Sequence, residues 1–332
     1  MKRRLLRPVR WTPPPAPPRR EQSDPPLPPV RRIDVPGTGP EDVVVDADGR
    51  IITGVSDGSI LRIDATTGAI EVIGNSGGRP LGLEVCPDGS VLICDSRRGL
   101  LRLDPASGQV DVLVDTIDGV PLIGASNAVQ TGDGTIYFSS STQRFEVEDH
   151  VGDIMEHRGT GRLFRRDPDG GVETLLEGLQ FANGVVLAPD RSHVLVAESG
   201  GYCVTRYWLT GSRAGQSDTL VENLPGFPDN MSLGSDGLVW VSIAAPRNPL
   251  LDRLQPRPVV LRQVSWLLPA WLRPKGERTV WVMALSFDGA IVHDLQRPGD
   301  DYHFVTSVWE DGGTLYLGSF YDTAIAVTSV PS

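Results

Sequence analysis

Cysteine is scarce in this sequence, and its placement does not suggest a disulfide framework. The 332 residues include three cysteines, an odd number, with Cys203 far from the other two. Cys86 and Cys94 flank the turn Pro87-Asp88-Gly89 out of register for a cross-strand pair. Cysteine usage of this kind is typical of a reducing compartment, so we predict a cytoplasmic protein.

Long apolar runs are also missing. No stretch approaches the roughly 18 apolar residues of a membrane-spanning helix. The basic N-terminus MKRRLLRPVRWTPPP lacks the apolar segment of a secretory signal. We therefore expect no transmembrane segment.

Basic residues are fewer than acidic ones. Lys and Arg total 31 against 42 Asp and Glu, which gives a formal net charge of −11. For the surface as a whole, this balance argues against nucleic acid and anionic membranes as partners. Cations and a small-molecule substrate are the expected partners.

Several catalytic signatures are absent. The chain has no G-x-S-x-G elbow, no G-x-x-x-x-G-K-[ST] loop, no H-E-x-x-H and no paired C-x-x-C. The blades proposed below carry no WD dipeptides either. The chemistries that depend on those motifs are therefore not expected.

What the sequence does contain is a repeated hairpin. Short β-branched runs alternate with turns at or near Asp-Gly, as in VVVDADGRIITGV, LEVCPDGSVLICD and MSLGSDGLVWVSI. Six versions of this unit occur, and most are followed by a second hairpin, such as ILRIDATTGAIEVI. The pattern predicts an all-β fold, a six-bladed β-propeller with four-stranded blades over residues 37–330.

The last blade lacks a strand of its own. After Val305 the sequence offers three strands before the chain ends, so we expect Arg31–Val35 to supply the fourth and close the ring. The preceding residues belong to a Pro-rich extension, 1–36, that should stay extended. For residues 1–29 two possibilities remain open, a segment wrapped around the propeller and a flexible leader.

Two insertions interrupt the repeat, at 141–161 and 245–279. The second carries Leu250, Leu254, Val264, Leu267 and Trp271 at near-helical spacing, which predicts one or two short helices. Its apolar face could pack on the top of the propeller, form a lid over the mouth, or contact a membrane interface.

Register along the innermost strands identifies a candidate metal site. Glu41, Asn183 and Asp229 each lie seven residues before a hairpin-turn Asp, and Asn127 lies six before Asp133. The comparable positions in the remaining blades are Leu81 and Thr306. Equivalent positions of a propeller face one axis, so the four polar residues should converge. Capping of turns is the alternative role for such residues.

Side-chain oxygens without His or Cys select a hard cation. Ca²⁺ tolerates irregular geometry and is the expected metal, with Mg²⁺ or Mn²⁺ as alternatives. The predicted ligands are Glu41, Asn127, Asn183 and Asp229. Asn230 could add a further oxygen.

Longer motifs carry a family resemblance. The segments GPEDVVVDADG, GRPLGLEVCPDG, LPGFPDNMSLGSDGLVWVSIAAPRNP and DGGTLYLGSF resemble the strictosidine synthase-like branch of the gluconolactonase and paraoxonase propellers. The chain is most similar to the adipocyte plasma membrane-associated protein group, over roughly residues 37–330. The resemblance implies an axial Ca²⁺, as in the hydrolase members, held by the same four residues that register selects.

The chain departs from the family at three places. Strictosidine synthases use a catalytic Glu in the last blade, where this chain has Thr306, so their condensation is not favoured. Paraoxonases carry a His in the turn that here reads Arg79-Pro80-Leu81-Gly82. Relatives often show Thr-Asp where this chain has Ser139-Ser140.

The leading functional hypothesis is a calcium-dependent hydrolase of small lactones or aryl esters. Asp229 is the candidate for orienting or deprotonating the attacking water, and His150 in the first insertion could reach over the mouth, as could His157. Arg79 and Arg144 are predicted to be solvated. The alternatives are a non-catalytic, calcium-stabilised scaffold or ligand-binding propeller, and a strictosidine synthase-type C–N lyase or condensing enzyme.

Overall fold

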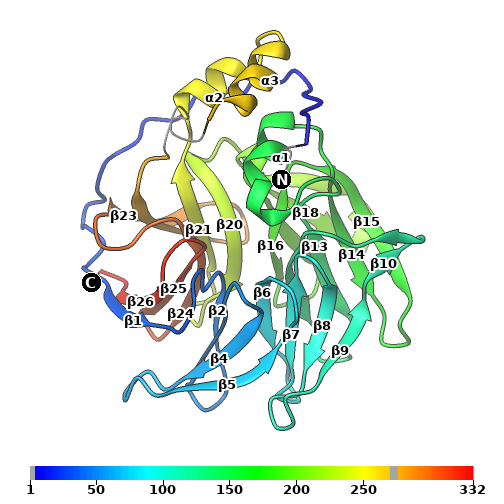
Figure 1. Cartoon of the computed structure of the whole chain (residues 1–332), viewed down its shortest axis with the longest axis vertical. Helices are drawn as coiled ribbons and strands as arrows, with labels where there is room; N and C mark the ends of the chain where they lie inside the picture. Colours follow the sequence, from blue (N-terminus) through cyan, green and yellow to red (C-terminus); the bar gives the residue numbers. More distant parts are fainter. Residues whose placement is uncertain (1–3, 270–275, 332) are drawn as a thin grey trace.

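The computed structural model, which describes residues 4–269 and 276–331, is a ring of six four-stranded antiparallel sheets (Figure 1). This confirms the predicted six-bladed propeller. The first three blades are β2 (Val43–Val45), β3 (Ile51–Gly54), β4 (Ser59–Ile63), β5 (Ile70–Asn75); β6 (Pro80–Val85), β7 (Val91–Asp95), β8 (Gly99–Leu103), β9 (Val110–Val114); and β12 (Ala125–Gln130), β13 (Ile136–Ser140), β14 (Gly161–Arg166), β15 (Val172–Leu179).

The remaining blades follow the same order. They are β16 (Ala182–Leu187), β17 (His193–Glu198), β18 (Cys203–Trp208), β19 (Ser217–Val221); β20 (Gly226–Leu233), β21 (Val239–Pro246), β22 (Thr279–Leu285), β23 (Ile291–Pro298); and β24 (Val305–Asp311), β25 (Thr314–Ser319), β26 (Ala324–Ser329) with β1 (Arg31–Asp34). A small hairpin, β10 (Thr116–Ile117) and β11 (Val120–Pro121), follows the second blade.

The hairpin turns show why this sequence repeats Asp-Gly. In the first blade the Asp46 carboxylate accepts hydrogen bonds from the backbone N–H groups of Asp48 and Arg50, at 3.0 and 2.9 Å. Gly49 then takes a φ of +76°, which a residue without a Cβ adopts at little cost. At the next two turns the Asp of the Asp-Gly pair is itself the acceptor: Asp88 and Asp133 each accept the N–H two residues further on, whereas in the first blade the acceptor is Asp46, two residues before the Asp-Gly pair. Each turn fixes the register of its two strands.

The ring is closed by a strand from the other end of the chain. β1 pairs antiparallel with β26, with Ile33 opposite Ile325, which confirms the predicted closing strand (Figure 1). Ile33 is buried in an apolar cluster that also includes Val43 and Ile51 of the first blade. β1 therefore ties the last blade to the first, and the edge of β26 is paired instead of open.

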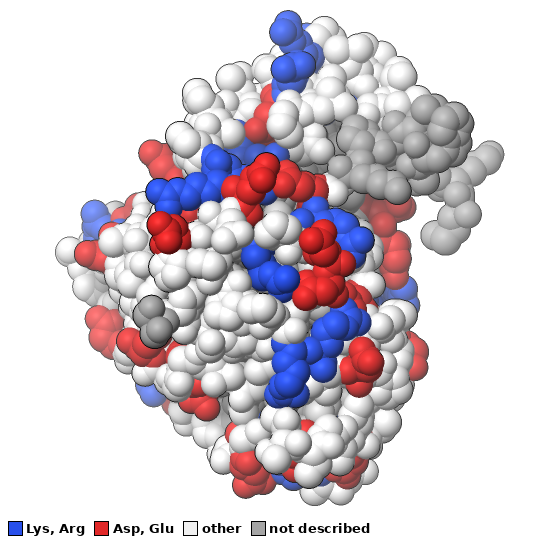
Figure 2. Space-filling model, turned by 90° about the vertical axis from the view of Figure 1, so that its left-hand side faces the viewer, with Lys and Arg blue, Asp and Glu red and all other residues white. Residues whose placement is uncertain are grey.

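The described residues include three α-helices, which lie in the upper half of Figure 1, two of them beyond the edge of the ring. α1 (His150–Glu156), preceded by the 3₁₀ turn Val147–Asp149, belongs to the first insertion. α2 (Pro249–Leu254) and α3 (Val260–Leu267) belong to the second, as its spacing predicted; Trp271 lies outside the described residues. We refer to residues 4–14, 141–161 and 249–267 together as the cap. In Figure 2 the upper part of the molecule is largely uncharged apart from basic side chains at its apex, whereas acidic and basic side chains are interspersed over the rest of the visible face.

The N-terminal extension is the strap that holds the cap together. Leu6 packs with Phe145, Met155 and Trp266, which joins the extension to both insertions. Arg262 of α3 is fully buried, and its guanidinium donates to the carbonyl oxygens of Met155 and Val9 at 2.7 and 2.6 Å. Of the two possibilities for this segment, the structure shows the wrapped one.

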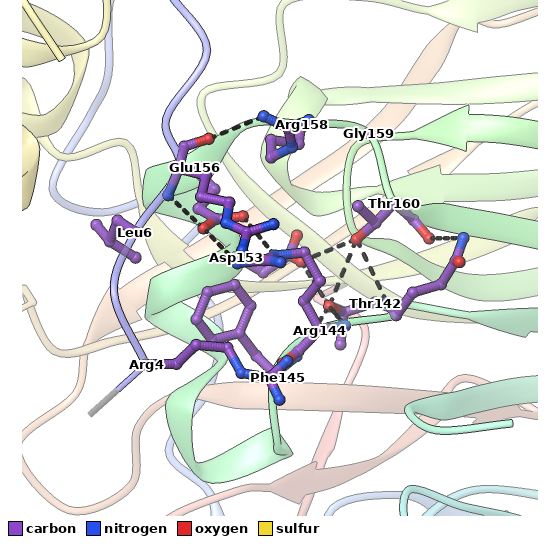
Figure 3. Close-up of polar contacts among 12 residues, drawn as sticks. Arg4, Leu6, Thr142, Arg144, Phe145, Asp153, Glu156, Arg158, Gly159 and Thr160 are labelled. Carbon is purple, nitrogen blue, oxygen red and sulfur yellow. Dashed lines mark hydrogen bonds and ion pairs between the residues drawn. The ribbon is translucent and has the colours of Figure 1, made fainter. Parts of the chain in front are cut away.

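A buried polar cluster joins α1 to the strand ends below it (Figure 3). Thr142 and Thr160 donate to the Asp153 carboxylate at 2.5 and 3.1 Å. Burial, with a smaller contribution from the charge of Glu156, raises the pKa of Asp153 to about 6. Glu156 itself forms an ion pair with Arg144 at 2.9 Å and accepts the Arg7 N–H at 2.5 Å. The prediction of a solvated Arg144 is wrong, because this pair draws it against α1.

None of the helices in the described part of the chain is long and apolar enough to cross a membrane. Cys86 and Cys94 are buried free thiols, and Cys203 is a partly buried one.

Shortening Ile33 should weaken the closure of the ring. We expect Ile33→Ala to lower the free energy of unfolding by about 3 kcal/mol, because a buried side chain is truncated at the joint between the first and last blades. Chemical denaturation of the full chain measures this. Arg31→Ala, on the exposed face of the same strand, should change it by less than about 0.5 kcal/mol; equal losses for both variants would contradict the assigned role of Ile33.

Neutralising Asp153 should change how stability depends on pH. Its folded pKa lies above the usual value of an Asp carboxyl, so its stabilising contribution is present in full below about pH 4 and is lost as the pH rises through about 6. Relative to wild type, Asp153→Asn should therefore gain roughly 2 kcal/mol between about pH 4 and about pH 8. Thermal melts across this range test it, with the exposed-turn variant Asp169→Asn as the control that should show no such drift.

Candidate active site at the mouth of the channel

A cavity opens at the end of the central channel that the cap overlies. Glu41, Asn183, Asp229 and Thr306 lie along its lining. The first insertion contributes Glu146 and His150 to the same cavity. Side chains from four blades and from the cap therefore meet at one place.

β-bulges direct the innermost side chains. The pairing of the innermost strand shifts between Ala125 and Ala128, between Ala182 and Val185, and twice between Gly226 and Met231. These irregularities enclose Asn127, Asn183 and Asp229, and comparable shifts lie at Leu81 and Thr306. A bulge adds a residue to one strand and re-aims its side chain. The predicted register positions thus coincide with places where the ladder is locally broken.

Close approach of the blades at this level requires glycine. A Cβ on Gly184 would lie 2.2 Å from the backbone N of Met231 in the next blade. Any larger residue would separate β16 from β20. Gly184 therefore brings Asn183 beside Asp229, and the Asn183 amide donates a hydrogen bond to the Asp229 carboxylate.

The predicted ligands are held by neighbouring blades. The Asn183 oxygen accepts from the Ser126 hydroxyl at 2.8 Å. Both carboxylate oxygens of Glu41 accept from the Asn230 amide, at 3.3 and 3.2 Å. Each side chain is thus fixed in position before any ligand arrives.

Asn127 does not line the mouth. It borders a second cavity of about 280 Å³ at the other end of the channel, together with Asp42 and Glu84. Its oxygen accepts the Val185 N–H at 2.9 Å, which leaves that oxygen one lone pair. The structure therefore brings three of the four predicted ligands together at the mouth and places the fourth on the channel side.

Burial dominates the electrostatics of the channel. It raises the pKa of Glu41 well above its usual range, and the neighbouring Asp229 charge raises it further. Burial also raises the pKa of Asp229 to about 8, that of Asp42 to about 7 and that of Glu84 to about 8. Four carboxyl groups in one narrow channel can be ionised together only if positive charge balances them.

Arg79 supplies part of that balance. It is buried, not solvated as predicted, and it donates to the Gly39 carbonyl at 2.8 Å and lies over the Phe320 ring. Its charge lowers the pKa of Glu41. No local pattern indicated this burial, because an Arg in a turn is usually exposed.

The donor set fits a hard divalent cation. Carboxylate and amide oxygens converge at the mouth without a His or Cys ligand, and one arginine does not neutralise the acidic groups around it. The Asn230 side-chain oxygen, beside Glu41, is buried and has no hydrogen-bond partner. Within residues 4–269 and 276–331, no three His, Cys, Asp or Glu side chains form a metal cluster, so a site here depends on its amide oxygens.

His150 reaches the mouth, and His157 does not. The Nδ1 atom of His150 lies 2.9 Å from the Val147 carbonyl oxygen, so Nδ1 carries the proton and Nε2 is available as an acceptor. Its ring contacts Phe320, and burial lowers its pKa. His157 instead stacks on Trp11 of the strap, with ring centroids 4.0 Å apart.

The departures from the family have structural roles. Thr306 donates to the Glu41 carbonyl at 2.6 Å, and Ser139 donates to the Asn183 carbonyl at the same distance. Both hydroxyls hold the backbone of a predicted ligand. Sequence reasoning missed Ser126, although its hydroxyl orients Asn183; its place beside Asn127 was the one available signal.

Comparison with known proteins agrees with the fold and the resemblance. The family model described as strictosidine synthase matches residues 126–212, and the strictosidine synthase-like N-terminal model matches residues 27–63. The adipocyte plasma membrane-associated protein of Rattus norvegicus is 34% identical over 89% of this chain and 84% of its own length. The strictosidine synthase-like 6 protein of Arabidopsis thaliana is 28% identical over 86% and 77%.

Solved structures share the propeller at low sequence identity. A gluconolactonase from Xanthomonas campestris superposes with a TM-score of 0.65 at 16% identity, covering 91% of this chain and 89% of its own. The calcium-binding protein regucalcin from Agrobacterium tumefaciens gives 0.64 at 14%, covering 92% and 94%. These likenesses establish the fold. From the family models and the identity with the rat protein, the chain belongs to the strictosidine synthase-like family that includes the adipocyte plasma membrane-associated proteins.

Proposed function

We propose that this propeller is a calcium-dependent hydrolase of small lactones or aryl esters. The observation that carries the proposal is the convergence of Glu41, Asn183 and Asp229 at the bottom of a mouth that His150 overlies. The structural neighbours include a gluconolactonase and a calcium-binding propeller, which favours the same chemistry.

The cation would be held by Glu41, Asn183 and Asp229, with Asn127 contributing from the channel side. When bound, a divalent cation supplies Lewis acidity toward a substrate carbonyl. Mg²⁺ or Mn²⁺ would suit the same oxygens less well than Ca²⁺, because the donors come from separate blades and are irregularly placed.

Asp229 is positioned to orient and deprotonate the attacking water. The Asn183 amide holds one of its oxygens, Oδ1, so the carboxylate keeps a fixed orientation while its other oxygen can take a proton. The side chain is partly accessible at the mouth, where a water can approach it.

His150 would act from the part of the mouth that the first insertion lines. Its neutral ring presents Nε2 as an acceptor while Nδ1 is committed to the Val147 carbonyl. It can take the proton of the water or return one to the leaving oxygen. Phe304 and Phe320 beside it form an apolar wall suited to the hydrocarbon part of a lactone or aryl ester.

A calcium-stabilised scaffold is the second candidate. Polar side chains at the axis already join adjacent blades: Asp42 accepts the Leu83 N–H at 2.7 Å, and Asn127 accepts the Val185 N–H. A cation held by residues of several blades would strengthen the same joints without any turnover. The lyase or condensing activity is not favoured, since Thr306 is committed to the Glu41 carbonyl.

Hydrolysis rates on a panel of lactones and aryl esters distinguish the two candidates. Wild type should show turnover that a chelator removes and added Ca²⁺ restores. Asp229→Asn should lower kcat/KM at least about a hundredfold at saturating Ca²⁺, because the proton acceptor is lost. Glu84→Gln, which changes a channel carboxyl at the far end, should stay within about threefold of wild type.

A wild-type protein that hydrolyses nothing on the panel, yet melts at a higher temperature with Ca²⁺ than without, supports the scaffold. Loss of turnover in Glu84→Gln equal to that in Asp229→Asn would show that channel charge in general, not Asp229, is responsible.

His150→Gln tests the proposed role of His150 in proton transfer. The amide keeps polarity but cannot accept a proton at neutral pH, so kcat should fall about tenfold to a hundredfold with Ca²⁺ affinity unchanged. His157→Gln is the matched control, since that ring lies on Trp11 away from the mouth. Equal kcat values for His150→Gln and wild type would remove His150 from the mechanism.

A further inference from the structure

The outer face of α3 is apolar, and no segment within residues 4–269 and 276–331 covers it. Val260, Val264 and Leu267 are 53%, 56% and 59% exposed, whereas Arg262 and Trp266 on the inner face are buried. The three exposed residues recur at i, i+4 and i+7, so they form one stripe along the helix. A stripe of this kind in contact with water is costly unless another surface covers it.

The strap extends this apolar stripe. Leu5, 69% exposed, borders the same shallow hollow as Val260, Val264 and Leu267. The hollow therefore brings two segments together that lie about 255 residues apart in the sequence. We call Leu5, Val260, Val264 and Leu267 the cap face.

Arginines surround the cap face. Arg4, Arg7 and Arg144 line the same hollow. Residues 4–10 contain three arginines and no acidic residue, and within the described chain Arg4 and Arg7 form no ion pair with an acidic side chain. Arg144 is neutralised by its ion pair with Glu156, so the local positive charge comes from Arg4 and Arg7, and it is opposite to the net charge of −11.

We propose that the cap face docks on the surface of a lipid bilayer that contains anionic lipid. Apolar side chains on one helical stripe, flanked by cationic ones, fit an interface in which hydrocarbon lies beneath anionic headgroups. A second copy of the chain would bring like-charged arginines together, which disfavours self-association through this face. The chain-wide deficit of positive charge does not oppose docking, because salt screens the distant acidic groups within about 10 Å.

Docking would also orient the propeller. Trp266 of α3 packs edge-on against Phe145 of the first insertion, which supplies Glu146 and His150 to the mouth. The cap face and the mouth are therefore built on the same packed unit. A propeller held by this face would therefore have the segment that lines its mouth packed directly against the docked helix.

Flotation with lipid vesicles tests the proposal on the full chain. Wild type should float with vesicles of phosphatidylcholine and phosphatidylglycerol, and much less with phosphatidylcholine alone. Raised salt should weaken the binding. Val264→Asp with Leu267→Asp should lower vesicle affinity at least about tenfold, because two side chains can no longer enter the interface.

Matched variants separate this face from general stickiness. Val72→Asp changes an equally exposed valine (61%) on β5 and should bind as wild type does. Arg7→Gln should lower affinity about fivefold, as expected for one cation near an anionic surface. Each substituted side chain is exposed, so melting temperatures should stay within a few degrees of wild type.

The proposal is overturned if wild type fails to float with anionic vesicles, or if Val72→Asp loses as much binding as the double variant. It is also overturned if light scattering shows a wild-type dimer that the double variant dissolves while neither binds vesicles. That result would assign the cap face to a second copy of the chain.

Discussion

The burial of four carboxyl groups around one narrow channel is the constraint on which the rest of this structure depends. Glu41, Asp42, Glu84 and Asp229 all have raised pKa values because burial disfavours their charge. Backbone N–H groups of neighbouring blades donate hydrogen bonds to carboxyl groups in the channel, and one buried arginine supplies positive charge. Binding of the proposed cation at the mouth would complete that balance.

The closing strand and the strap also help to position the residues around the channel. The closing strand holds the ring together, so that residues from separate blades keep their positions around the axis. The strap binds the two insertions into one cap, and the cap brings His150 to the mouth. Proline suits the strap, because an extended segment loses little entropy when it is laid along a surface. Much of the chain outside the blades thus contributes to the surroundings of the mouth.

The blades were predictable because their signal is local. Asp-Gly turns fix register, alternating residues mark strands, and the missing fourth strand of the last blade pointed to Arg31–Asp34. The site was only partly predictable. Counting from the turn Asp found Glu41, Asn183 and Asp229 at the mouth, but also Asn127, which lies on the channel side. A β-bulge changes where a side chain points without changing its distance from the turn.

By itself, the sequence determined the number of blades, the closing strand and the polar residues nearest the axis, since each follows from spacing along the chain, and its longer motifs indicated the family. Only the tertiary structure decided which of those residues share a cavity, that Arg79 is buried against Phe320, and that the strap joins the cap. These outcomes depend on contacts between segments far apart in the chain. Their free energies come from packing and burial, which no local pattern of residues specifies.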